Sequence, residues 1–155
     1  GQEGEEDRGD LAEEAGLMAQ WRYSEDRKPP MPVIELALRT LDGKASYPTL
    51  PERERKIEVD TGYDGSILVP DYVYFDVLHL NRFELPERGE IRTPLGETEE
   101  LHLARAFAVI PRMNAVIITI VETFMGCEEA LAGRELLNRY VLTLNGPEKR
   151  LYAKE

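Results

Sequence analysis

The chain has 155 residues, of which 42% are hydrophobic, and it carries a formal net charge of -11. That length and composition favour one domain with a single buried core. The acidic balance argues against a nucleic-acid partner, because phosphate contacts require clustered Lys and Arg side chains.

Cysteine content and hydropathy exclude further classes of protein. The single cysteine, Cys127, excludes an intramolecular disulfide and a cysteine-based metal knuckle. No apolar run approaches the roughly 20 residues that a membrane-spanning helix needs, so we expect no such segment in the sequence as given. We expect a cytoplasmic location, although a start at Gly1 is also compatible with a removed targeting segment.

Residues 1–30 differ in composition from the rest of the chain. Glu, Asp, Arg and Gly dominate them, and the stretch ends in Pro29-Pro30. We interpret it as an acidic, flexible N-terminal arm, with a short helix between Leu11 and Trp21, before a domain of residues 31–155. The arm is either a solvated extension or a segment that occludes an active site, and its composition favours the solvated extension.

Extended segments alternate with turn signals in the first part of the domain. Apolar residues within 31–41 precede the Asp42-Gly43 pair, which predicts a strand followed by a turn. Further strands are predicted at 56–60, where polar and apolar residues alternate, and at 66–69. The loop that starts at Asp60 therefore connects two strands.

The second part of the domain adds a hairpin and two short helices. Apolar residues at helical spacing predict helices at 70–80 and 134–140. Pro and Gly in the turn of residues 93–97 predict a hairpin that spans 90–110, and the β-branched run at 116–121 predicts a buried strand. These elements together predict an all-β, barrel-like domain with short helices.

The tripeptide Asp60-Thr61-Gly62 is the motif most relevant to chemistry. An apolar strand delivers Asp60 into a loop, and the loop returns through Gly65 into another apolar strand. An Asp in a turn that is followed by Thr and Gly is ordinarily a capping or turn residue. A second motif, Gly133-Arg134 followed by Leu136 and Leu137, lies far downstream.

With both motifs in this order, the chain resembles the retropepsin-like aspartic proteases, and most closely their single-domain microbial members. Tyr63 departs from the small residue that usually follows the tripeptide. The resemblance implies a closed β-barrel of the acid protease fold with a flap hairpin. It also implies a homodimer, because one chain supplies one catalytic Asp and the reaction needs two.

The resemblance also implies roles for individual residues. Asp60 is the catalytic residue, and two copies about 3 Å apart share one proton. Thr61, Gly62, Asp64, Gly133 and Arg134 support the loop, with an ion pair between Asp64 and Arg134. The expected flap and substrate-binding residues form the hairpin turn, namely Thr93, Pro94, Leu95, Gly96 and Glu97.

The expected activity is that of an aspartic endopeptidase that acts on peptide or protein substrates without a cofactor or metal. His79 and His102 have no acidic or cysteine partner at ligand spacing, so we expect them to be surface or packing residues. The acidic neighbours of Cys127 disfavour a reactive thiolate. The alternative is a dimerisation or peptide-binding module of the same fold with little or no catalytic activity.

Overall fold

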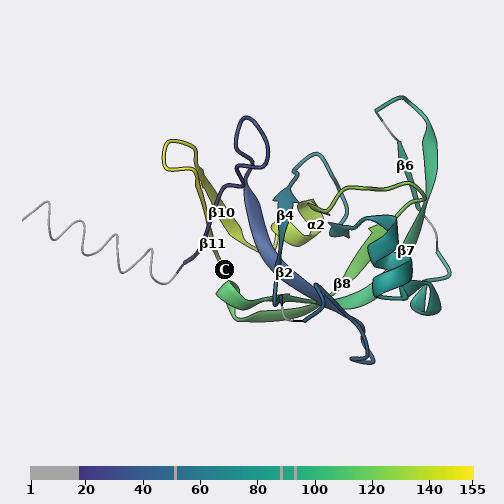
Figure 1. Ribbon diagram of the computed structural model, residues 1–155. Coiled ribbons are helices and arrows are strands. Elements are labelled where there is room, and N and C mark those ends of the chain that lie inside the picture. The colour runs from purple at the N-terminus through teal and green to yellow at the C-terminus, as the bar shows by residue number, and fades with distance from the viewer. Residues whose placement is uncertain (1–17, 51, 88, 93) are drawn as a thin grey trace, which may run out of the picture.

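The computed structural model describes residues 18–50, 52–87, 89–92 and 94–155 of a mostly β protein (Figure 1). The strands are β1 (Ala19–Arg22), β2 (Val33–Arg39), β3 (Ser46–Tyr47), β4 (Arg55–Val59), β5 (Ile67–Leu68), β6 (Gly89–Arg92), β7 (Thr98–Ile110), β8 (Ala115–Thr123), β9 (Leu131–Ala132), β10 (Val141–Asn145) and β11 (Arg150–Lys154). The helical segments are η1 (Val73–Val77), η2 (Leu80–Phe83), η3 (Pro111–Met113) and α2 (Arg134–Leu137).

Most strands belong to one sheet that closes on itself. Its order is β3-β2-β4-β9-β5-β8-β7-β6, and β2 also pairs with β7. The additional pairing joins the two ends of the run from β2 to β7, so these strands form a ring around the core. On β7, the small residues Ala104, Ala106 and Ala108 are fully buried, because alternate side chains of a strand point to the same face.

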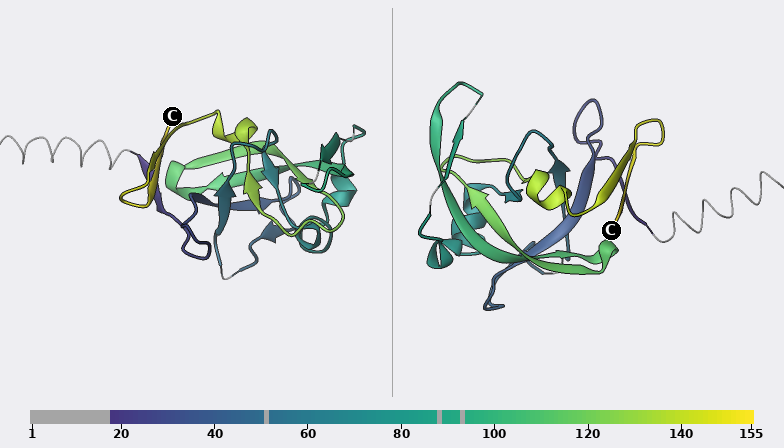
Figure 2. Two further views of the ribbon diagram at one scale, coloured as in Figure 1. Left: turned by 90° about the horizontal axis from the view of Figure 1, so that it is seen from above. Right: turned by 180° about the vertical axis from the view of Figure 1, so that it is seen from behind.

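The hairpin predicted in 90–110 is confirmed. β6 and β7 pair antiparallel, from Gly89 opposite Leu101 to Arg92 opposite Thr98. Gly96 in the turn has φ of +82°, a backbone conformation that favours glycine. Figures 1 and 2 show that the hairpin projects from the body of the molecule, at the end opposite the small sheet of β1, β11 and β10.

Part of the stretch predicted as a flexible arm belongs to the folded domain. Residues 19–22 form β1, which pairs antiparallel with β11 near the C-terminus. Trp21 anchors this strand in the core, since only 2% of its surface is exposed. Because β1 is part of the folded domain, the domain boundary expected at residue 31 is wrong. The sequence does not indicate this boundary because β11, the strand that pairs with β1, is distant in the sequence.

The helix predicted between Leu11 and Trp21 is wrong over the residues that β1 occupies. Residues 11–17 of that predicted helix lie outside the part of the chain that the structure describes. Acidic composition concealed the strand, because β1 is stabilised by pairing and by burial of Trp21 rather than by a local pattern.

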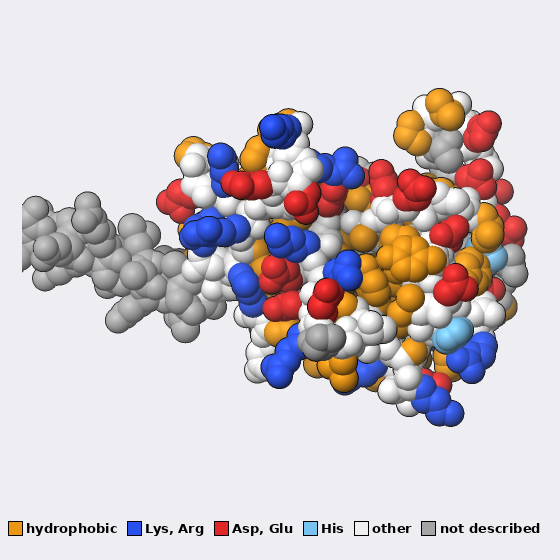
Figure 3. All heavy atoms as spheres, viewed as in Figure 1, with side chains coloured by type: hydrophobic (Ala, Val, Ile, Leu, Met, Phe, Trp, Pro, Cys, Tyr) orange, Lys and Arg blue, Asp and Glu red, His pale blue; other side chains and the backbone are white. Residues whose placement is uncertain are grey.

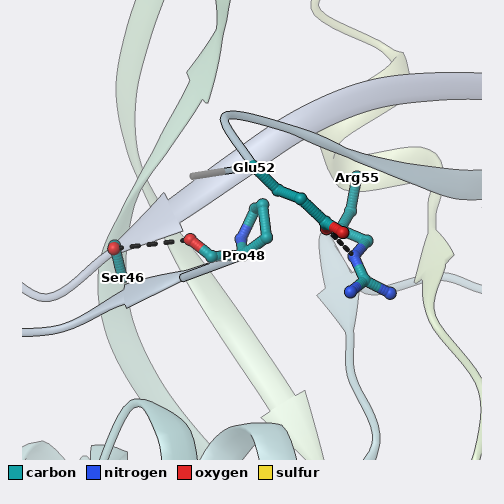
Figure 4. Close-up of polar contacts among 4 residues, drawn as sticks. All are labelled: Ser46, Pro48, Glu52 and Arg55. Carbon is teal, nitrogen blue, oxygen red and sulfur yellow. Dashed lines mark hydrogen bonds and ion pairs between the residues drawn. The ribbon is translucent and has the colours of Figure 1, made fainter. Parts of the chain in front are cut away.

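Local polar contacts lie on both sides of residue 51 in the link between β3 and β4 (Figure 4). Ser46 Oγ donates to the carbonyl of Pro48 at 3.4 Å, and Arg55 Nε donates to Glu52 Oε2 at 3.0 Å. The Glu52 and Arg55 side chains are about half exposed, so this ion pair contributes little to stability.

The two predicted helices are present and shorter than expected. A π-turn occupies 73–77, where the N–H of Leu78 bonds to the carbonyl of Val73 at 2.9 Å. The second helix, α2, ends at Leu137 rather than Tyr140. The apolar spacing predicts where each helix lies, but it does not specify the local hydrogen bonds at which the helix ends.

The strand predicted to be buried at 116–121 is only partly buried. Val116 and Ile118 of β8 are 56% and 53% exposed, whereas Thr119 and Val121 lie inside. The first half of β8 extends beyond the ring. Within the described residues it pairs with β7 alone, whereas residues 121–122 also pair with β5. A β-branched run therefore predicted the strand but not how many of its faces are covered.

Candidate active site

Asp60 follows the last residue of β4, where the chain leaves the sheet. β4 pairs with β2 on one side and in parallel with β9 on the other. The backbone N–H of Asp60 continues this ladder and donates a hydrogen bond of 3.0 Å to the carbonyl of Ala132. The start of the Asp60 loop is therefore fixed to the segment that leads into α2.

The Asp60 carboxylate is oriented by its own loop. Oδ1 accepts a hydrogen bond of 2.9 Å from the backbone N–H of Gly62. The backbone carbonyl of Asp60 accepts one of 3.2 Å from Tyr63. Asp60 is half-buried, and Oδ2 has no hydrogen-bond partner among the residues that the structure describes. One carboxylate oxygen is thus held in place while the other is open to a ligand.

The N-terminus of α2 is joined to the same loop through the backbone. The N–H groups at the start of a helix have no partner within the helix and need acceptors elsewhere. Here the N–H groups of Gly133, Arg134 and Glu135 donate to the carbonyls of Ser66, Tyr63 and Gly65, at 2.9, 2.9 and 3.1 Å. The two motifs that are far apart in sequence therefore form one structural unit.

A cavity of about 370 Å³ lies between the Asp60 loop and the projecting hairpin. Figure 3 shows the hollow between the hairpin and the body of the molecule, with acidic side chains along its edge and hydrophobic side chains at the hairpin tip. The residues lining the cavity are Asp60, Gly62, Tyr63, Asp64, Leu68, Glu90, Ile91, Arg92, Pro94, Phe124, Glu129, Leu131 and Arg134.

The structure places some of the predicted site residues together and others apart. The cavity brings together Asp60, Gly62, Asp64, Pro94 and Arg134. The predicted residues that do not line it are Thr61, Leu95, Gly96, Glu97 and Gly133, and Thr93 lies outside the described residues. Leu95 is 88% exposed at the hairpin tip, so in this conformation the tip stands away from the cavity.

The ion pair expected between Asp64 and Arg134 is not formed. Both side chains are exposed at the cavity, but no ion pair joins them within the described part of the chain. Backbone hydrogen bonds connect the loop to α2 instead, including the bond from Arg134 N–H to the carbonyl of Tyr63. Both charged groups therefore remain available at the cavity surface.

Sequence reasoning did not predict that two polar side chains, Tyr63 of the loop and Glu122 of β8, are buried close to each other. Tyr63 is 6% exposed and Glu122 on β8 is 8% exposed. Burial raises the pKa of the Glu122 carboxyl to about 7, and it raises the pKa of the Tyr63 hydroxyl far above its usual range. The available signal was a single acidic residue that ends the β-branched run of β8.

An apolar wall of the cavity was also missed. Ile91 of the hairpin and Phe124 are half-buried and pack against a buried cluster that includes Leu68 and Leu131. All four line the cavity next to the acidic groups. A ligand in the cavity therefore meets an apolar surface on one side and charged side chains on the other.

Neither the histidines nor the cysteine lines the cavity that holds Asp60. His79 is exposed, and His102 Nδ1 lies 2.7 Å from Glu84 Oε1 in a packed contact with Phe75. Cys127 is buried, and burial raises the pKa of its thiol. Within the described ranges, no group of three or more His, Cys, Asp or Glu side chains is arranged to hold a metal ion.

The fold and site define a mostly β protein in which a loop-borne carboxylate lies beneath a projecting hairpin. Comparisons of the chain with protein-family models, with curated proteins and with solved structures find no match. Over the described residues, no helix combines the length and the apolar character that crossing a bilayer requires.

Proposed function

We propose that this protein is an aspartic endopeptidase of the retropepsin-like class, active as a homodimer with one Asp60 from each chain. The observation that carries the proposal is the position of Asp60. Its carboxylate lies in a cavity between a hairpin and the Asp60 loop, with one oxygen held by Gly62 and the other open. The joining of this loop to Gly133 and Arg134 supports it further.

The need for two chains follows from the chemistry of the site. Hydrolysis by carboxyl groups requires one group that accepts a proton and one that donates a proton. In each chain, Thr61 and Gly62 are exposed beside the half-buried Asp60. These residues form a surface through which a second copy can bring its own carboxylate close to the first, with the two loops related by a twofold axis.

In the proposed dyad, the two Asp60 carboxyls lie about 3 Å apart and share a proton, because like charges at that distance cannot both be ionised. The ionised group takes a proton from a water molecule whose oxygen attacks the scissile carbonyl carbon. The protonated group donates its hydrogen bond to the carbonyl oxygen as negative charge develops there. Protonation of the amide nitrogen and cleavage of the C–N bond then release two peptides.

The hairpin is the proposed flap, which covers an extended peptide and excludes water. Glu90, Ile91, Arg92 and Pro94 already line the cavity from the hairpin side. Leu95 at the exposed tip moves toward the substrate when the flap closes. The apolar wall that includes Phe124 and Leu131 accepts a hydrophobic side chain of the substrate.

The first experiment is cleavage of a mixed peptide library across acidic to neutral pH, read by mass spectrometry. Wild type is compared with Asp60→Asn and with Asp76→Asn, an exposed aspartate on η1 outside the cavity. The proposal expects identical cuts from wild type and Asp76→Asn and none from Asp60→Asn.

Two outcomes would overturn the endopeptidase. Unchanged cleavage by Asp60→Asn would remove Asp60 from the mechanism. Peptide binding without any cleavage, in protein confirmed to be dimeric, would replace the enzyme with the peptide-binding module as the function of this cavity.

A further inference from the structure

Glu122 is a buried acidic residue that the proposed mechanism does not use. It lies on β8 between two neighbouring strands, opposite Leu68 of β5 and Leu103 of β7. Its backbone carbonyl accepts a hydrogen bond of 3.0 Å from Val69, and its side chain is inside the protein. Burial of a charged carboxylate without a basic partner is strongly unfavourable, so the neutral form of Glu122 suits this site.

The side chain of Glu122 faces Tyr63, the residue that follows the catalytic tripeptide. The Tyr63 hydroxyl is buried and has no well-aligned hydrogen-bond partner among the described residues. The hydroxyl and Glu122 Oε1 border the same space beside Gly65, because a Cβ on Gly65 would lie closer than 3.0 Å to both oxygens. The absence of a side chain at Gly65 is therefore what allows the two polar groups to approach each other.

The charged groups that act on Glu122 are all acidic. Asp64 approaches from the Asp60 loop and Glu135 from α2, while the strand residues opposite Glu122 carry no charge. A protonated carboxyl and a tyrosine hydroxyl can each donate and accept a hydrogen bond, so the neutral pair is mutually compatible. Ionised Glu122 would place a third negative charge beneath a loop that already carries Asp60 and Asp64.

We infer that Glu122, in its protonated form and through Tyr63, is a positioning residue for Asp60, an inference that rests on the proposed function. Tyr63 is two residues beyond Thr61, and its backbone N–H bonds to the carbonyl of Asp60 at 3.2 Å. A shift of the Tyr63 ring therefore moves the loop that carries the catalytic carboxylate. Burial and the negative charges of Asp64 and Glu135 oppose ionisation of Glu122 and outweigh the hydrogen bond from the Tyr63 hydroxyl, which favours the carboxylate. Ionised Glu122 therefore repels Asp64 and displaces the loop, whereas the neutral side chain leaves the loop in place.

The direction of the pH effect follows from burial. The pKa of Glu122 is raised from 4.5 to about 7 in the folded protein. The folded state therefore binds a proton that the unfolded state has released, and folding stability falls as pH rises from 4.5 to about 7. Above that pH range the loss of folding stability is complete. Below it, Glu122 is neutral in both the folded and the unfolded state, and its burial carries no charge penalty.

The test compares wild type with Glu122→Gln, which is neutral at every pH, and with Glu128→Gln, which removes an exposed carboxylate nearby. The first readout is the thermal unfolding midpoint between the two pKa values. Glu122→Gln is expected to lose the decline that wild type and Glu128→Gln show. This readout needs no enzymatic activity.

The second readout is the ratio of kcat for Glu122→Gln to kcat for wild type. Dividing the two profiles cancels the titration of the Asp60 dyad, which both proteins share. The ratio is expected to stay near one in acid and to rise to about tenfold one pH unit above the pKa of Glu122, where about a tenth of wild-type molecules keep that proton. Tyr63→Phe is expected to lower kcat about tenfold with KM unchanged.

Three outcomes would overturn the inference. An unfolding midpoint that depends on pH equally in Glu122→Gln and wild type shows that Glu122 does not hold a proton. If the unfolding midpoint of Glu122→Gln no longer depends on pH but the kcat ratio is also independent of pH, Glu122 is a purely structural residue. The proposed protease function then still stands. Absence of cleavage by wild type removes the protease and the positioning role together, and only the buried neutral carboxyl then remains.

Discussion

At Gly133 two backbone segments meet without room for a side chain. A Cβ there would lie 2.7 Å from the carbonyl oxygen of Tyr63 and 2.5 Å from its ring carbon Cδ2. We expect Gly133→Ala to lower the free energy of unfolding by about 1–3 kcal/mol, because the backbone of the Asp60 loop must shift. Urea denaturation measures the change.

The control for this variant is Gly146→Ala. No atom lies within 4 Å of a Cβ at Gly146, and its φ is not in the left-handed region. The methyl group therefore meets open space and the stability should change by less than about 0.5 kcal/mol. Equal losses in the two variants would show that the close approach at Gly133 is not what makes glycine necessary.

At the residue scale, the sequence predicted where the two motifs of the candidate site lie, but not the buried residues that pack beneath them. Asp60 in a loop between two strands, and Gly133-Arg134 at the start of a helix, were both expected and both found. The Asp64–Arg134 ion pair was expected and is absent from the described residues. Side-chain pairing depends on rotamers, which sequence motifs do not determine, whereas backbone contacts follow from the fold.

At the scale of elements, substitution of Trp21 in β1 tests whether this strand belongs to the folded domain. We expect Trp21→Ala to destabilise the protein by about 3–5 kcal/mol, because a fully buried indole leaves a large cavity. Trp21→Phe should lose less, since Nε1 has no hydrogen-bond partner among the described residues and the ring still fills much of the space. Thermal unfolding of both variants provides the comparison.

Leu50→Ala is the control for the Trp21 variants, because Leu50 is 84% exposed and contributes little buried area. It should leave the unfolding midpoint unchanged. A Trp21→Ala protein as stable as Leu50→Ala would mean that residues 19–22 behave as the flexible arm that composition indicated.

The projecting hairpin is the second element with a testable role. If the hairpin is the proposed flap, we expect Leu95→Ser to reduce kcat/KM about tenfold, because the tip would lose apolar contact with the peptide that the flap covers. The unfolding midpoint should not change, since Leu95 is already in solvent. Leu50→Ser removes an equally exposed leucine outside the cavity and should leave kcat/KM unaltered; equal activity in both variants would argue against a flap.

At the scale of the whole molecule, the proposed homodimer makes activity depend on subunit mixing. Asp60→Asn subunits should pair with wild-type subunits and inactivate them, because each dyad needs two carboxyls. In an equimolar mixture at random pairing, about a quarter of the dimers keep two wild-type chains. We therefore expect about a quarter of the activity of the same total concentration of wild type.

The activity of the mixture is measured after the subunits have equilibrated, at several protein concentrations. This measurement distinguishes inactivation by mixed dimers from simple dilution of the wild-type protein. A monomeric enzyme would retain half of its activity in the same mixture. The exposed Asp76→Asn subunit is the control, and it should leave activity at the wild-type level in any ratio.

By itself, the sequence determined the local features of this protein: its mostly β character, the loop at Asp60, the hairpin and two short helices. Turn residues, alternation and helical spacing act over a few residues and can be read directly. Only the tertiary structure decided that β1 belongs to the domain, that Val116 and Ile118 of β8 are exposed, and that Glu122 lies beneath Tyr63. Each of these depends on contacts between residues distant in sequence, and burial is a property of those contacts rather than of any local pattern.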